Sequence, residues 1–195
     1  MLTPWARHSR RKSWTRSPGS VRSTAHEQKK WVAANVLAAH PASARTLVRE
    51  LLRAGVREQN PSFNRAFVIP LKPHVTYEDA VVLGLELIET EADAGGLARL
   101  EYWLEIELGP GTLSTQRAMN RWRIESFLCV SDGYARRSLL AGISFAKAHL
   151  DTSAARLARR VIAIASSSDD AYLRHRLQNQ RRDSAAFPAL LPPGG

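Results

Sequence analysis

The clearest pattern of apolar and polar positions lies between residues 98 and 108. Apolar or aromatic side chains occupy every second position there, and charged side chains with one tryptophan fill the positions between them. A helix over this stretch would leave Tyr102 and Ile106 on its polar side. The period of two therefore favours a half-buried strand.

Alternation returns at residues 120–130, after a Gly-Pro-Gly turn at residues 109–111. An antiparallel register of the two strands sets acids opposite bases on one face and apolar side chains opposite one another on the other. The predicted cross-strand pairs are Glu107–Arg121, Glu105–Arg123, Ile106–Trp122 and Leu104–Ile124. This agreement of both faces predicts that most of these charges are structural partners of one another.

Helical spacing of apolar residues predicts a hairpin of two helices at residues 24–40 and 43–55, joined by a tight turn that contains Pro41. Arginines recur every four residues beside the apolar face of the second helix, at Arg45, Arg49, Arg53 and Arg57. A basic second helix is typical of helix-turn-helix modules that bind DNA. An ordinary αα-hairpin with a solvated basic face gives the same pattern.

The remaining segments predict more helices and one or two more strands. Capping residues open helices at residues 76–92, at 132–150 and from 151 onward, and a short basic helix is expected at 169–182. A short strand is expected within residues 63–71, where Pro70 marks its end or an edge position. The run Val161–Ala165 fits either a buried strand or the end of a helix.

The predicted fold class is therefore α+β, an N-terminal helical hairpin followed by a small antiparallel sheet packed with helices. If Val161–Ala165 is a strand, the order of elements is the β-α-β-β-α-β of ferredoxin-like folds. If it is helical, the sheet has three strands. The predicted parts are a disordered basic arm at 1–23, a helix-turn-helix-like hairpin at 24–58, an α/β body at 63–182 and a loose tail at 183–195.

Charge is the unusual feature of the composition. The 195 residues include 28 basic and 18 acidic side chains, a net charge of +10. Residues 1–26 carry six basic groups and no acid, residues 27–73 carry eight and three, residues 74–112 carry one and nine, and residues 113–195 carry thirteen and six. Two basic flanks thus enclose an acidic middle, which predicts a polarised surface that attracts phosphate on one side.

Three interpretations fit the arm at residues 1–23. It can hold nucleic acid, with Trp5 and Trp14 stacking on bases. It can be an organelle-targeting presequence, because such segments are rich in Arg and Ser and poor in acids. It can also be a translated extension without a role. The cytoplasm is the predicted compartment, and an organelle is the alternative if the arm is a presequence.

Few residues suggest catalytic or metal chemistry. The single cysteine, Cys129, excludes an internal disulfide and is expected to be an inert core residue. His74 and Glu78 have a metal-ligand spacing but no third ligand in view, and the glutamates at 101, 105 and 107 are expected to pair with arginines rather than Mg²⁺. Trp103 can stack on a base, dock a partner or be covered by a helix. No enzyme activity, cofactor or metal is predicted.

These observations predict a non-enzymatic protein that binds DNA or RNA through its arm and its basic helix. The predicted contacts to phosphate are Arg7, Arg10, Arg11, Lys12, Arg16, Arg45, Arg49 and Arg53. The alternative is an interaction or adaptor subunit of a larger assembly, with a homodimer or another protein as partner; a small enzyme is a weaker third. The first gains if the arginines of residues 45–53 and those of residues 156–160 share one face, and the second gains if they are scattered or paired with acids.

The arm hypothesis predicts a steep salt dependence of nucleic-acid binding. Six arm charges acting together contribute up to roughly −5 to the slope of log K against log salt concentration. The measurement is binding of short duplex DNA and single-stranded RNA over a salt series, by the full chain and by a chain that begins at Ser23. Equal slopes for the two chains would contradict a role of the arm.

Overall fold

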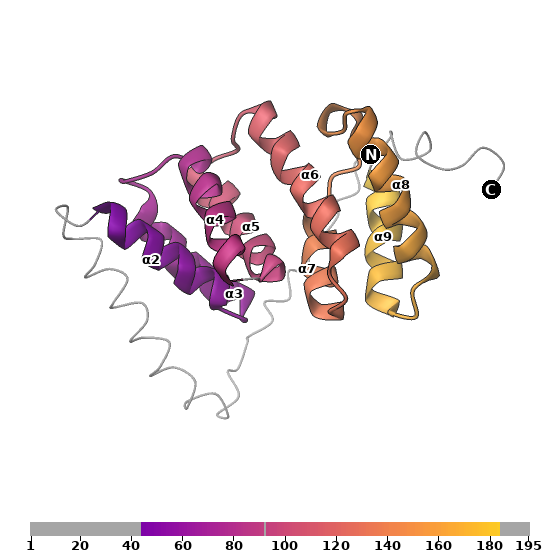
Figure 1. Cartoon of the computed structure of the whole chain (residues 1–195), viewed down its shortest axis with the longest axis horizontal. Coiled ribbons are helices and arrows are strands. Elements are labelled where there is room, and N and C mark those ends of the chain that lie inside the picture. The colour runs from indigo at the N-terminus through magenta and orange to yellow at the C-terminus, as the bar shows by residue number, and fades with distance from the viewer. Residues whose placement is uncertain (1–43, 92, 184–195) are drawn as a thin grey trace, which may run out of the picture.

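The structure, a computed structural model, describes residues 44–91 and 93–183, and these residues form helices joined by short connections. Eight α-helices and two 3₁₀ helices follow one another in this part of the chain. They are α2 (Ala44–Arg57), α3 (Pro61–Val68), η3 (Ile69–Leu71), α4 (Tyr77–Glu91), α5 (Ala94–Leu108), α6 (Leu113–Cys129), α7 (Gly133–Gly142), η4 (Lys147–His149), α8 (Thr152–Ser167) and α9 (Ala171–Asp183). Figure 1 shows them as an elongated array that runs from α2 at one end to α8 and α9 at the other.

The array is a row of four helical hairpins, α2–α3, α4–α5, α6–α7 and α8–α9. The second helices of the hairpins pack on one another in sequence, α3 on α5, α5 on α7 and α7 on α9. Among the first helices, α2 packs on α4 and α6 packs on α8. The second helices start at residues 61, 94, 133 and 171, a spacing of 33 to 39 residues that is typical of α-solenoid repeat proteins.

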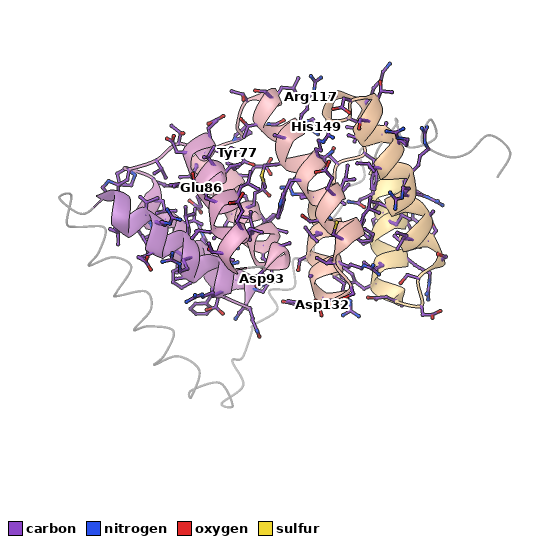
Figure 2. All side chains as sticks on the ribbon, viewed as in Figure 1. Tyr77, Glu86, Asp93, Arg117, Asp132 and His149 are labelled. Carbon is purple, nitrogen blue, oxygen red and sulfur yellow. The ribbon has the colours of Figure 1, made fainter. Side chains whose placement is uncertain are left out.

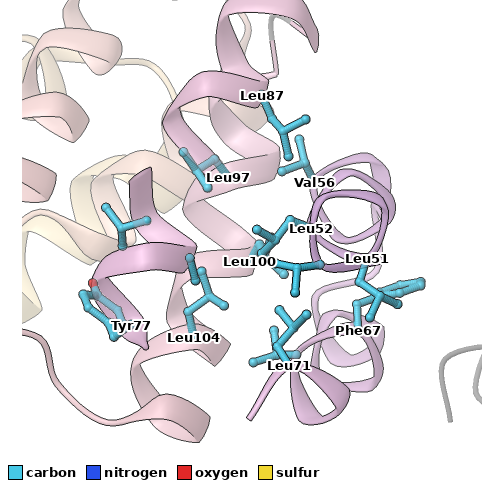
Figure 3. Close-up of a cluster of buried hydrophobic side chains, with 14 of the residues drawn as sticks. Leu51, Leu52, Val56, Phe67, Leu71, Tyr77, Leu87, Leu97, Leu100 and Leu104 are labelled. Carbon is cyan, nitrogen blue, oxygen red and sulfur yellow. The ribbon is translucent and has the colours of Figure 1, made fainter. Parts of the chain in front are cut away.

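Two hydrophobic clusters hold the hairpins together. The first joins α2, α3, α4 and α5, and Figure 3 shows its leucines interleaved around Leu52 and Leu100, neither of which has any exposed surface. The second joins α6, α7, α8 and α9 around Phe127. Trp122 packs against both clusters, so the two halves share one continuous apolar interior.

The helix starts that the sequence marked with capping residues are confirmed. Thr76 and Asp79 form the reciprocal capping box of α4, with the amide of each bonded to the side chain of the other at 3.2 Å. Asp132 caps α7 by accepting from the amide of Ala135, and Asp151 caps α8 in the same way. The second predicted helix, 43–55, corresponds to α2. The predicted 132–150 helix is wrong in length, because α7 ends at Gly142.

The α+β prediction is wrong, because no strand occurs in residues 44–91 and 93–183. Residues 98–108 belong to α5, residues 120–129 to α6, residues 63–71 to α3 and η3, and Val161–Ala165 lies inside α8. The predicted cross-strand pairs and the ferredoxin-like order fall with the sheet. Glu107 instead pairs with Arg65 and Lys72, and Arg121 pairs with Glu125 and Asp151.

The reason for the error lies on α5. Leu97, Leu100 and Leu104 form its buried stripe, while Tyr102 and Ile106 are more than half exposed. The sequence argument rejected a helix because a helix would expose these two residues. The structure exposes them, so the pattern of α5 departs from ordinary amphipathicity at surface positions that a partner can use.

Some predictions fall on residues outside the described part of the chain. These are the arm at 1–23, the helix at 24–40 and most of the tail at 183–195. Within the described ranges, none of the helices is both long enough and apolar enough to cross a membrane.

Truncating the centre of the first cluster tests the packing. Leu100→Ala removes a fully buried side chain that contacts α2, and we expect it to lower the free energy of unfolding by about 2–5 kcal/mol. Leu113→Ala is the control, because Leu113 is exposed and its loss should change stability by less than about 0.5 kcal/mol. Urea denaturation of both variants measures the difference, and equal losses would contradict this core.

Candidate functional site

A groove of about 600 Å³ lies across α5, α7 and α9, with Pro61 of α3 at one side and Arg123 of α6 at its floor. The volume falls within the range of sites that bind small ligands or short segments of a chain. The groove forms because the second helices of successive hairpins stand side by side and carry small side chains where they face it. Those small residues are Ala98 on α5 and Ser138, Ala141 and Gly142 on α7.

Three tyrosines from three successive hairpins line this groove. Tyr102 of α5 is 58% exposed, Tyr134 of α7 is 48% exposed and Tyr172 of α9 is 46% exposed. Large aromatic side chains at this exposure are uncommon on a monomer surface unless they meet a partner. The groove thus presents a row of rings to whatever enters it.

An arginine of each second helix lies over an aromatic ring of the next second helix. Arg65 of α3 is 5.5 Å from the ring centre of Trp103, Arg99 of α5 is 5.1 Å from that of Tyr134, and Arg137 of α7 is 5.7 Å from that of Tyr172. These are cation–π distances. The repeated contact fixes each ring against its neighbouring hairpin, so the aromatic row is held in place before any ligand binds.

The floor of the groove contains a buried ion pair between Glu101 of α5 and Arg123 of α6. The same carboxylate accepts a hydrogen bond from the hydroxyl of Tyr77 in α4, and Arg123 donates to the carbonyl of Gly142 in α7 at 2.9 Å. A side chain at position 142 would bring its Cβ within 2.8 Å of the Arg123 Nε atom. Glycine at that position therefore allows the guanidinium to reach the end of α7.

Burial raises the pKa of the Tyr77 hydroxyl well above its ordinary value, and the neighbouring Glu101 carboxylate raises it further. The hydroxyl therefore keeps its proton and remains a donor to Glu101. Near the groove, hydrogen bonds from Lys72 and Arg65 lower the pKa of Glu107, which lies beside the Trp103 contact. These shifts belong to groups that hold helices together.

Two polar positions outside the groove have a structural explanation. Figure 2 shows Asp93 and Asp132 at one edge of the array, where they cap α5 and α7, and Arg117 and His149 at the opposite edge. The His149 Nδ1 atom lies 2.8 Å from the Ser144 hydroxyl, and Asn120 bonds to the backbone of both residues. This arrangement fixes the connection between α7 and α8.

The structure does not bring the predicted phosphate-binding residues together. Arg7, Arg10, Arg11, Lys12 and Arg16 lie outside the described residues, and so does the side chain of Arg45. Arg49 lies 3.8 Å from Glu86, and Arg53 is paired with Glu50. Their helix, α2, is at the end of the array opposite to α8, which carries Arg156, Arg159 and Arg160 (Figure 1). Their role in binding nucleic acid stays a prediction.

The other residues considered in the sequence also have assigned places. Cys129, expected in the core, is exposed at the end of α6. Trp103 is covered by α3 and donates to the carbonyl of Pro61 at 2.6 Å. The glutamates at 101, 105 and 107 are dispersed: the first is buried, the second is exposed and the third pairs with bases. Within the described ranges, no three acidic, histidine or cysteine side chains form a group that could hold a metal ion.

Sequence reasoning missed the groove, although one signal for it is present. Asp132 and Tyr134 open α7 in the same way that Asp170 and Tyr172 open α9, 38 residues later. Arg99 and Arg137 are also 38 residues apart and each contacts the tyrosine of the next helix. A search for internal repeats would have paired these positions before any strand was assigned.

No protein-family model, no curated protein and no solved structure matches this chain. The groove and its residues therefore carry the functional argument.

The Tyr77–Glu101 contact predicts a loss of stability in alkali. The unfolded tyrosine releases its proton above about pH 10, whereas the folded one keeps it, so the stabilisation is complete below pH 10 and declines as the pH rises. We expect the free energy of unfolding to fall by about 1 kcal/mol between pH 9 and pH 11 for this group.

Urea denaturation at pH 8 to 11 measures this decline. Tyr77→Phe should be less stable at pH 8 and should lose that part of the pH dependence. Tyr172→Phe is the matched control, because its ring is half exposed and its loss should leave the profile unchanged. A profile of Tyr77→Phe identical to that of the unmodified chain would refute the assignment.

Proposed function

We propose that this protein is a non-enzymatic interaction scaffold that binds an extended segment of a partner protein in the groove across α5, α7 and α9. The observation that carries the proposal is the row of exposed tyrosines over a hollow of about 600 Å³. Helical-repeat arrays present elongated surfaces of this kind to extended ligands. Tyrosine, arginine and tryptophan are also the residues that concentrate in the energetic centres of protein interfaces.

The charges of the groove support a protein segment over a polyanion. Its arginines are largely neutralised: Arg123 is paired with Glu101, Arg137 lies 2.7 Å from Asp170, and Arg99 lies 3.6 Å from Asp93. Nucleic-acid sites instead carry a clear excess of positive charge. A groove with balanced charges and aromatic walls suits a peptide of mixed composition.

The polar groups of the groove also support binding rather than catalysis. Glu101, Arg123 and Arg137 are held in ion pairs that connect one helix to another. A catalytic acid or base needs a free position from which it can reach a substrate. The cytoplasm remains the proposed compartment, with an organelle as the alternative.

A second candidate function, binding of nucleic acid, is favoured by one observation at the far end of the array. Arg156, Arg159 and Arg160 are exposed on α8, and within the described residues none of them has a carboxylate partner. Residues 113–183 as a whole carry thirteen basic and six acidic groups. The terminal repeat of such an array also needs a polar outer face, which these arginines supply in either case. The salt series on DNA and RNA described above distinguishes the two roles.

Blocking the groove tests the proposed function. A display library of random peptides of about twelve residues, long enough to cross the groove, is selected against the full chain. Ser138→Trp fills the hollow and should abolish binding of the selected peptides, and Tyr134→Ala should weaken it about 10- to 100-fold. Arg159→Ala, on α8, is the control and should leave binding unchanged.

Thermal unfolding of each variant establishes that the fold is kept. Peptides that bind all the variants equally, or a selection that yields no binder above background, would refute binding in the groove.

A further inference from the structure

We propose that the segment bound in the groove is bipolar, with an acidic residue over α9, a basic residue over α5 about five or six positions away, and an apolar side chain between them. This inference rests on the proposed function, because it specifies the ligand of the same groove. It follows from the two charges of the groove that the protein itself leaves unpaired, and from their positions.

The first of these charges is Arg176 on α9. Its only printed partner is the carbonyl of Ala141, to which its Nη2 atom donates at 2.8 Å, and its buried Nε atom has no hydrogen-bond partner. The other three arginines that line the groove have carboxylates within 4 Å. Arg176 is therefore the cation that an incoming carboxylate can pair with at least cost to the fold.

The second charge is Glu105 on α5. It lines the groove, is exposed, and forms no ion pair within the described residues. The neighbouring Glu101 and Glu107 are both held by bases from other helices. Glu105 is therefore the acid at the α5 end of the groove that a basic side chain can meet.

The position of the helices sets the spacing between these two charges. α7 lies between α5 and α9 and packs against both. Packed helix axes are about 8–10 Å apart, so the two outer helices are roughly 16–20 Å apart. An extended chain advances about 3.3 Å per residue, and five or six residues span this distance.

The middle of the groove determines what lies between the two charges. Ala98, Ala141 and Gly142 carry little or no side chain where they line it, and the ring of Tyr134 stands beside them. An apolar or aromatic side chain fills such a hollow without burying an unpaired polar group. A uniform polyanion would place negative charge against Glu105, so nucleic acid is disfavoured here.

Charge reversal in the same peptide selection tests the inference. Peptides that bind the full chain should share a basic and an acidic residue five or six positions apart with an apolar residue between them. Arg176→Glu should weaken these peptides about tenfold and should select peptides without the acidic residue. Glu105→Arg should do the same for the basic residue. Arg159→Glu, a charge reversal on α8, is the matched control and should leave both features unchanged.

The milder variants Arg176→Gln and Glu105→Gln provide the same comparison with less disturbance of the fold, and thermal unfolding checks each variant. Peptides that need the open groove, and so fail to bind Ser138→Trp, but show no paired charges would overturn the inference and leave the proposed function standing. A selection without any groove-dependent peptide would overturn both. Displacement of the peptides by an oligonucleotide of mixed sequence, at the same concentration and dependent on Arg176, would favour a polyanion and overturn the bipolar ligand.

Discussion

The buried contact between Glu101 and Arg123 is the point on which the arrangement of the hairpins depends. Through Tyr77 and the carbonyl of Gly142 it ties α4, α5, α6 and α7 together at the junction of the two hydrophobic clusters. A buried ion pair adds little net stability compared with apolar residues of the same size, but removing one partner leaves a charge without compensation. Only an arrangement that brings these four helices together satisfies both charges. We infer that the pair fixes the register between the first and second halves of the array.

The groove follows from that register. Once α5, α6 and α7 are locked, each second helix offers an arginine to the aromatic ring of the next, and the rings are supported from behind while one face stays open. A rigid, pre-positioned aromatic surface loses little conformational entropy when a ligand binds. The same contacts therefore serve the stability of the array and the readiness of the groove.

The sequence predicts the local features of this protein better than its fold. The capping boxes at Thr76 and Asp132 depend on residues within one turn, and the helices that they open are present. The assignment of 98–108 to a strand failed because Tyr102 and Ile106 are exposed for reasons outside their own helix. Burial of Arg123 likewise depends on Glu101, 22 positions away, and on the absence of a side chain at Gly142. Such long-range compensation is invisible to periodicity, whereas the 38-residue recurrence of the Asp-x-Tyr helix starts was available.

The place of the last hairpin in the array links ligand binding to local unfolding. α8 and α9 pack on α6 and α7 alone, so within the described array this hairpin has a neighbour on one side and can open without disturbing the Glu101 junction. Tyr172 and Arg176, however, belong to α9 and complete the groove. A ligand that spans α5 and α9 therefore binds only the closed form and shifts the opening equilibrium by mass action. Amide hydrogen exchange in α9 would thus report occupancy of a groove whose other wall is two hairpins away.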